Sequence, residues 1–315
     1  MKKVTLQEML SLIIRKLREN GRWGTAHITQ STLNVFSAFI DHAKLPLGKL
    51  DSAILKRFEM YLRQRDCSWN TISTYMRTLR SAYNQAVDLG YVRYTPRLFK
   101  HIYTGTKADK KRALEIAGMG TLVRDMEVFL SQQNPVLGNQ RTKLLFVFMF
   151  LTRGLPFVDL AYLHKKDLQG NVLSYRRRKT GRAMRVVLSP EAIQLVRLIA
   201  DTNQDSPYLF PILHSEEGSE EAYREYQSAL RYFNYQLSSL KKQLNLDSHL
   251  STYTARHTWA TMAYYCEIHP GIISEAMGHS SINVTETYLK PFHNKKIDEV
   301  NEKVISFVKG NGAVE

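Results

Sequence analysis

The sequence has only two cysteines, Cys67 and Cys266, in 315 residues. Cysteines so few and so far apart exclude a disulfide framework and a zinc site built from closely spaced cysteine pairs. Such a composition is typical of a protein that works in a reducing cytoplasm, and this is where we expect it.

Long apolar segments are also missing. The longest continuous run is Leu144–Leu151, whereas a membrane-spanning helix needs roughly 20 apolar residues. The first residues, Met1–Thr5, lead directly into an amphipathic pattern without the apolar region of a secretory signal. The sequence therefore predicts no membrane partner.

Acidic residues are fewer than basic residues. The chain has 29 Asp and Glu against 44 Lys and Arg, which leaves a formal net charge of +15. Residues 1–105 hold 17 basic and 7 acidic residues, so most of the excess lies at the front. Clustered positive charge binds polyanions by releasing their counterions, so we expect a polyanionic partner. The alternative is a basic protein without such a partner.

The length and the 43% apolar content are sufficient for two hydrophobic cores. Residues 1–103 predict a helical domain; its first helix starts at Thr5, which forms a capping-box signal with Glu8. Residues 104–112 contain no large apolar side chain and predict a basic linker. Residues 113–315 then form the second domain.

Within the first domain, amphipathic patterns also cover residues 25–43, 51–66 and 68–89. The last of these places small hydroxyl side chains and arginines opposite an apolar stripe, a mixture that suits contact with phosphates and base edges. An ordinary solvated face is the alternative. The residues expected to contact DNA are Thr71, Thr74, Arg77 and Arg80 on this helix and Lys107, Lys110, Lys111 and Arg112 in the linker.

In the second domain, Leu144–Leu151 predicts a buried helix because it continues a helical region. Residues 172–179 and 183–188 flank Thr180-Gly181-Arg182 and predict a β-hairpin. Further helices are expected at residues 190–201, 220–244, 258–266 and 269–277. The expected fold class is mainly α, with a helical first domain and a mainly helical second domain that carries a small β-hairpin or sheet.

Three residues of the C-terminal part carry chemistry. His279 stands nine residues before Tyr288, and Arg256 precedes both. A guanidinium can clamp a phosphodiester, an imidazole can transfer its protons, and a phenol can attack its phosphorus. This order indicates covalent chemistry on DNA without a metal ion. His257 would point away from Arg256 on a helix, so a packing role is expected for it.

These motifs resemble the tyrosine recombinases, also called the phage integrase family. The resemblance rests on Lys179-Thr180-Gly181, Arg256-His257-Thr258, Gly278-His279-Ser280-Ser281 and Tyr288, and it covers nearly the whole chain. It implies a core-binding domain before the linker and a catalytic domain after it. It also implies a site-specific recombinase that acts on double-stranded DNA through a 3′-phosphotyrosyl link and a Holliday junction, with no metal and no cofactor.

The resemblance also implies residue roles. Tyr288 would be the nucleophile, Arg256 would hold the non-bridging phosphate oxygens, and His279 would donate to the same phosphate or move a proton. Lys179 on the hairpin would protonate the departing 5′-oxygen. Asp159 would support the site by orienting arginines; a helix-capping or surface carboxylate is the alternative.

The chain departs from the family pattern at two places. Pro156 occupies the position of the family's first catalytic arginine, and Tyr253 replaces the usual histidine three residues before Arg256. A phenol can hydrogen-bond a phosphate oxygen but is a poor base at neutral pH.

The missing guanidinium would come from Arg153, about one turn before Pro156 if that segment is helical, or from Arg177. We favour Arg177, because its position two residues before Lys179 predicts that both lie on the same strand face.

The end of the chain predicts a short amphipathic helix. Its apolar residues are Ile297, Val300, Val304, Ile305, Phe307 and Val308. In the family, such a helix docks on the neighbouring protomer of a tetramer; docking in cis is the alternative.

The resemblance leaves the kind of recombinase open among a DNA invertase, a mobile-element integrase and a dimer resolvase. A need for an accessory DNA-bending protein stays open as well. Two further alternatives are a type IB topoisomerase and a DNA-binding member of the family that has lost catalysis.

Overall fold

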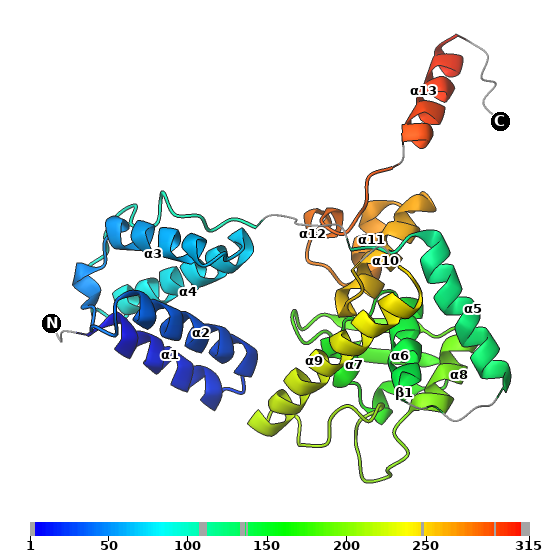
Figure 1. The fold of residues 1–315 in the computed structure, drawn as a ribbon, viewed down its shortest axis with the longest axis horizontal. Helices are drawn as coiled ribbons and strands as arrows, with labels where there is room; N and C mark the ends of the chain where they lie inside the picture. The colour runs from blue at the N-terminus through cyan, green and yellow to red at the C-terminus, as the bar shows by residue number, and fades with distance from the viewer. Residues whose placement is uncertain are drawn as a thin grey trace. The chain divides into compact units, whose positions relative to one another are not determined.

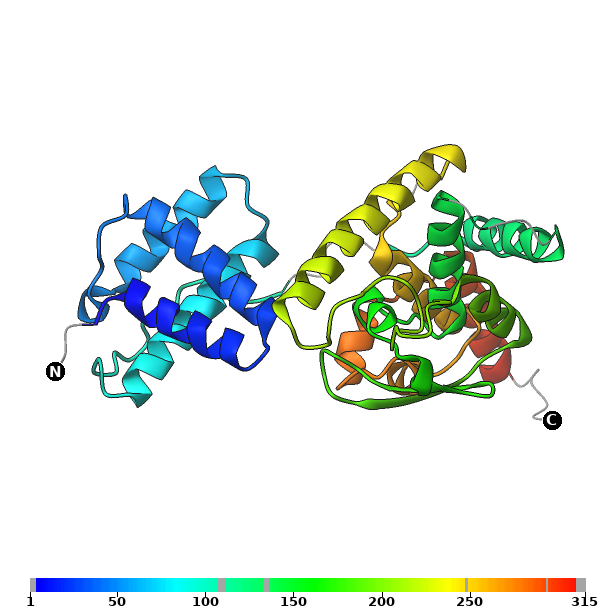
Figure 2. The same ribbon diagram turned by 90° about the horizontal axis from the view of Figure 1, so that it is seen from below.

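The computed structural model describes residues 4–106, 112–132, 136, 138–246, 249–292 and 294–309 (Figures 1 and 2). The chain divides into two compact units. One comprises Met1–Asp109 and Gly218–Tyr223, and the other comprises Lys110–Glu217 and Arg224–Glu315. Helices predominate, and the strands of the described residues form one small sheet, which confirms the mainly α fold class.

The first unit contains helices with amphipathic sequences. They are α1 (Leu6–Glu19), α2 (Trp23–Phe39), α3 (Ser52–Gln64) and α4 (Trp69–Asp88), with a 3-10 turn at Leu47–Lys49. The capping box expected at the start of α1 is confirmed, because Glu8 N donates to Thr5 Oγ1 (3.2 Å) and Thr5 N donates to the Glu8 carboxylate (2.9 Å). The apolar faces of these helices, including Phe36, Phe58 and Met76, form one buried core.

The second unit is built around a helix whose last eight residues, Leu144–Leu151, are all apolar. Helix α6 (Asn139–Leu151) buries Phe146, Val147, Phe148 and Met149 completely, which confirms the buried helix expected there. A helical segment without a polar face has to be enclosed on all sides. The other helices of this part are α5 (Ile116–Gln132), α7 (Phe157–Ala161), α8 (Pro190–Ile199), α9 (Glu220–Gln243), α10 (Thr252–Tyr265), α11 (Pro270–Ala276), α12 (Ile282–Glu286) and α13 (Asn294–Val308).

The sheet is antiparallel, in the order β1-β2-β3. Its strands are β1 (Leu168–Gln169), β2 (Val172–Arg176) and β3 (Ala183–Val187). The hairpin expected from the sequence is confirmed as β2 and β3, whereas β1 is too short to leave a pattern. Strand β2 ends at Arg176, so Arg177 and Lys179 lie in the connection between the strands. The predicted position of both residues on one strand face was therefore wrong.

Among the residues that the structure describes, no helix is both long and apolar enough to cross a membrane.

Candidate active site

Helix α10 positions Arg256 in the interior of the second unit. The helix begins after Ser251, whose backbone N–H donates to the Thr254 hydroxyl at 2.9 Å, and Arg256 follows in the second turn with 3% of its surface exposed. Its Nη1 donates to the Gly154 carbonyl (2.8 Å) and its Nη2 to the Met277 carbonyl (2.7 Å). Burial, followed by the charge of Arg177, lowers the pKa of Arg256.

The contact with Gly154 requires glycine. The residue has φ +68°, and a Cβ built on it would lie 2.8 Å from the Arg256 Cα. Any larger side chain would therefore push the carbonyl away from the guanidinium that it binds.

The loop around Gly154 also decides the place of Arg153. This arginine has φ +60°, and its Nη1 lies 3.4 Å from the carbonyl oxygen of Arg185 in β3. The segment between α6 and α7 is not helical, so the one-turn relationship to Pro156 assumed from the sequence was wrong.

Arg177 brings a second buried guanidinium into the site. Its Nε lies 2.7 Å from Asp159 Oδ2, and its Nη1 donates to the same Met277 carbonyl that Arg256 binds. Arg177 is 7% exposed and Asp159 2%. Two cations thus converge on one carbonyl oxygen while a single carboxylate faces them, which leaves an excess of positive charge where a phosphate can bind.

Asp159 also orders the hairpin. Its Oδ1 accepts the backbone N–H of Arg178 at 2.9 Å, so one carboxylate holds a guanidinium and the main chain next to Lys179. Burial raises the pKa of Asp159, while the neighbouring charge of Arg177 opposes the shift.

His279 lies against Arg256. Its Nε2 is 2.7 Å from Arg256 Nη2, and its Nδ1 is 2.7 Å from the Thr285 hydroxyl. Burial lowers the pKa of His279 to about 3, and the charges of Arg256, Arg177 and other nearby cations act in the same direction. The imidazole is therefore neutral at physiological pH.

Tyr288 follows α12 and lies between two histidines. Its ring centroid is 5.0 Å from that of His279, with nearly parallel planes, and 4.5 Å from that of His257. The Arg256 Cζ is 5.6 Å from the same centroid. The Tyr288 carbonyl accepts the Thr261 hydroxyl at 3.2 Å. His257 has the packing role expected for it, and its neighbour is the candidate nucleophile.

The turn between β2 and β3 carries Lys179, which is exposed. Its charge is one of those that lower the pKa of His279. Arg182, at the other end of the turn, donates to the His279 carbonyl at 2.8 Å and pairs with Glu275 at 2.6 Å. The hairpin is thereby attached to the segment that holds His279.

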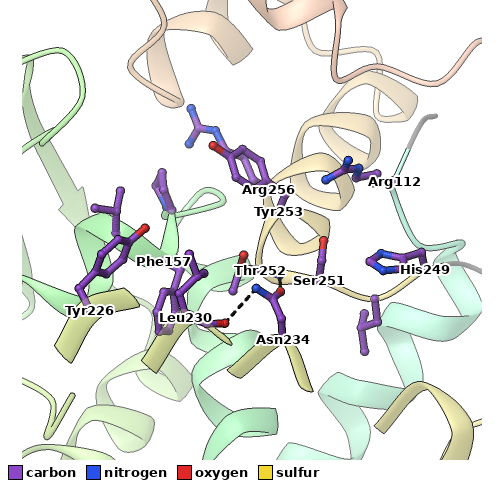
Figure 3. A pocket seen from close by; sticks show the side chains of 13 residues that line it. Arg112, Phe157, Tyr226, Leu230, Asn234, His249, Ser251, Thr252, Tyr253 and Arg256 are labelled. Atoms are coloured by element: carbon purple, nitrogen blue, oxygen red, sulfur yellow. Dashed lines mark hydrogen bonds between the residues drawn. The ribbon is translucent and has the colours of Figure 1, made fainter. Parts of the chain in front are cut away.

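A cavity of about 350 Å³ adjoins Arg256. Figure 3 shows Arg256, Tyr253 and Arg112 along one side of it and Phe157, Tyr226 and Leu230 at the other. Tyr253 is 50% exposed and stands one helical turn before Arg256, so its hydroxyl can reach a ligand of the arginine. Pro156 lines the same cavity.

The residues of α4 expected to contact DNA belong to the first unit. Arg77 and Arg80 are exposed, and Thr71 and Thr74 are half-buried. The Thr74 hydroxyl donates to the Asn70 carbonyl at 2.8 Å, as hydroxyl side chains inside helices often do. Of the residues expected in a linker, Arg112 is described, whereas Lys107, Lys110 and Lys111 lie outside the described residues.

Comparison with known proteins agrees with this arrangement. Residues 5–102 match the model of the phage integrase SAM-like domain, and residues 124–295 match that of the phage integrase family. The chain belongs to the phage integrase family and is a tyrosine site-specific recombinase.

Tyrosine recombinase XerC of Rickettsia canadensis (strain McKiel) is 24% identical over 261 residues, which cover 81% of each protein. A Tn1549 transposon integrase in complex with transposon right end DNA has a TM-score of 0.64 at 16% identity and covers 96% of this chain and 100% of that chain. A lambda integrase dimer bound to a core site has a TM-score of 0.60 at 14% identity, covering 90% and 77%. These two structures share the fold.

The structure adds groups that the sequence did not indicate. Thr285 contacts His279, Thr261 contacts the Tyr288 carbonyl, and the Met277 carbonyl joins the two arginines. A threonine hydroxyl and a main-chain oxygen leave no spacing signal, so only the fold could reveal them.

Proposed function

We propose that this recombinase cleaves and rejoins duplex DNA through a 3′-phosphotyrosyl link to Tyr288 and resolves a Holliday junction in successive strand exchanges. The observation that supports it most is that Arg256 and Arg177 share the Met277 carbonyl, while His279 contacts Arg256 and stacks on Tyr288. The first domain, residues 1–103, and the basic linker, residues 104–112, would bind the duplex. Arg77 and Arg80 would contact the sugar-phosphate backbone of the DNA. The catalytic domain, residues 113–315, would hold the scissile phosphate.

In this proposal, Arg256 and Arg177 bind the non-bridging oxygens of the scissile phosphate. Both guanidinia are buried, so their hydrogen bonds to the developing charge act in a medium of low dielectric constant. Arg177 supplies the charge that Pro156 cannot. Its attachment to Asp159 keeps it in place before DNA arrives, and preorganised donors are the effective ones.

The phenolic oxygen of Tyr288 attacks phosphorus, and the bond from phosphorus to the 5′-oxygen breaks. Lys179 gives its proton to the departing 5′-oxygen, and Tyr253 donates a hydrogen bond to a phosphate oxygen. The phosphodiester energy stays in the tyrosyl link, so rejoining needs only the reverse attack by a 5′-hydroxyl.

A nicked suicide duplex tests the function. Once the strand is cut, the short fragment leaves and the protein stays attached to DNA, which a denaturing gel detects as a shifted band. The wild-type chain should form this adduct and Tyr288→Phe should not, although both bind the duplex. Binding without any adduct from the wild-type chain would show instead a DNA-binding protein without catalysis, the alternative that Pro156 and Tyr253 motivate.

Helix α13 supports a tetramer as the working form. Its apolar residues are exposed: Ile297 54%, Val300 49%, Val304 56%, Ile305 42%, Phe307 64% and Val308 79%. A stripe of this kind on a helix needs a partner surface. We propose that it docks on the next protomer of a complex assembled on two DNA sites.

Inversion, integration and resolution share this chemistry and differ in the arrangement of the two sites. Inverted sites in one molecule give inversion, whereas sites in two molecules give integration. A reporter with two copies of the natural site in each arrangement separates them, and relaxation of supercoils without recombinant product would identify the topoisomerase alternative.

A further inference from the structure

His279 is in a single tautomer in this structure. Arg256 can only donate hydrogen bonds, so the His279 Nε2, 2.7 Å from Arg256 Nη2, has to be the acceptor. A neutral imidazole then carries its proton on Nδ1, and this proton points at the Thr285 hydroxyl oxygen 2.7 Å away. Thr285 is fully buried, so no solvent competes for this contact.

We propose that Thr285 is a positioning residue that keeps the His279 proton on Nδ1, so that Nε2 is free to accept the phenolic proton of Tyr288 during strand cleavage. The inference rests on the proposed function, in which Tyr288 is the nucleophile. It adds Thr285 to Tyr288 and His279, the two residues between which the phenolic proton moves.

The local chain path supports this role. Thr285 is in α12, and its carbonyl accepts the backbone N–H of Tyr288 at 2.8 Å. One residue therefore contacts the imidazole through its side chain and the nucleophile through its main chain. These two contacts fix the position of the His279 ring relative to the turn that carries Tyr288.

When a phosphate replaces His279 as a ligand of Arg256, Nε2 loses the cationic donor that occupies it. The phosphate charge then favours the imidazolium, whose Nδ1–H keeps Thr285 as its acceptor. The proton of Tyr288 moves to Nε2 as the phenolic oxygen bonds to phosphorus, while Lys179 protonates the 5′-oxygen. Rejoining returns the proton from Nε2 to the phenolic oxygen.

The alternative is that Thr285 merely fills space. Thr285→Val keeps the shape and removes the hydroxyl, whereas Thr285→Ser keeps the hydroxyl. We expect the rate of adduct formation on the suicide duplex to fall about 10- to 100-fold in the Val variant and to stay within about threefold of wild type in the Ser variant. Thr287→Val is the matched control, because that hydroxyl donates to the Val284 carbonyl at 2.7 Å. Equal rates for the Val and Ser variants would overturn the proposal.

The tautomer can be observed directly. Nitrogen-15 NMR of the full chain labelled in histidine distinguishes protonated Nδ1 from protonated Nε2, and His279→Gln assigns the signal. In the free chain Arg256 alone keeps Nε2 as an acceptor, so the measurement is made on the Tyr288→Phe chain bound to the uncut duplex, where the phosphate takes Arg256. In this complex we expect protonated Nδ1 with Thr285 or with Thr285→Ser, and a loss of this form with Thr285→Val. An unchanged tautomer with Thr285→Val, or protonated Nε2 with Thr285, would overturn the proposal.

A substrate with sulfur at the 5′-bridging position separates attack from departure, because a thiolate leaves without protonation. The defect of Thr285→Val should persist on this substrate, since the proposal places it in the attack by Tyr288. Full recovery would overturn the inference. If the wild-type chain formed no adduct at all, the proposed function would fail, and NMR would still decide whether Thr285 sets the tautomer.

Discussion

Arg177 Nε lies 2.7 Å from Asp159 Oδ2, and both side chains are buried beside Arg256. A buried ion pair adds little net stability, because desolvation of the two charges cancels much of their attraction. We interpret the pair as a contact by which Asp159 positions the Arg177 guanidinium for binding a ligand. In the proposed mechanism, Pro156 stands in the place of the family's first arginine, and Arg177 in the hairpin connection supplies the charge that the preceding loop lacks.

Replacing Arg177 should be far more damaging than replacing its neighbours. Arg177→Ala is expected to lower the cleavage rate on a suicide duplex by about 10²- to 10³-fold, the usual effect of losing one preorganised donor to an oxyanion. Arg176→Ala is the matched control, since Arg176 is exposed at the end of β2 and donates to the Gly181 carbonyl. Equal losses in the two variants would remove the case for Arg177.

Asp159 should affect both stability and activity. Asp159→Ala leaves Arg177 buried without its carboxylate and is expected to lower the free energy of unfolding by about 3–5 kcal/mol. Asp159→Asn keeps an acceptor for the Arg178 N–H but loses the charge, so it should fold better than the Ala variant and still cleave slowly. Urea denaturation and single-turnover cleavage measure the two effects. An Asn variant with full activity would show that the charge of Asp159 is not needed.

The neutral state of His279 predicts an acid-sensitive fold. The pKa of this residue falls from 6.5 in the unfolded chain to about 3 in the folded protein, so below pH 6.5 the unfolded state binds one proton more. Stability is therefore lost as the pH falls, by about 1.4 kcal/mol per pH unit between pH 6 and 4.

Substitution of His279 by a group that does not titrate tests this dependence. His279→Gln should make the free energy of unfolding less dependent on pH between 6 and 4, as measured by urea denaturation at a series of pH values. His101→Gln, a change at an exposed position of the first unit, is the control and should keep the wild-type slope. An unchanged slope in His279→Gln would mean that its pKa is close to that of the unfolded chain.

Removal of helix α13 should separate binding from assembly. A chain that ends at Lys296 lacks the exposed apolar stripe and should bind a single duplex site with wild-type affinity, since the basic first domain remains. It should form a complex of two sites at least about tenfold less well, if docking in trans supplies the affinity.

Point substitutions test the docking of α13 without shortening the chain. Val304→Ser with Phe307→Ser weakens the stripe, whereas Glu302→Ser with Lys303→Ser changes charged positions of the same helix. Gel-shift and cross-linking assays distinguish one-site from two-site complexes. Docking of α13 in cis would instead appear as a loss of thermal stability in the double variant Val304→Ser with Phe307→Ser.

The helices and the hairpin could be anticipated because their signals are local. The Thr5 and Glu8 capping box, the all-apolar run of α6 and the turn at Gly181 each depend on residues close in sequence. Strand β1 was not predicted because two residues are too few to show the alternation of apolar and polar side chains that indicates a strand. The loop at Arg153 was misjudged because α6 ends at Leu151 and both Arg153 and Gly154 have positive φ, so the one-turn spacing of a helix does not apply there.

By itself, the sequence determined the class of chemistry, because Arg256, His279 and Tyr288 stand at spacings that few other proteins share. Only the tertiary structure decided how the site is completed. Arg177 meets Arg256 at the Met277 carbonyl, 100 residues away from Arg177 along the chain, and Thr285 meets His279 around a turn. Such contacts depend on how α10, α12 and the hairpin pack together, and side-chain spacing along one chain does not encode the direction in which a guanidinium or a hydroxyl points.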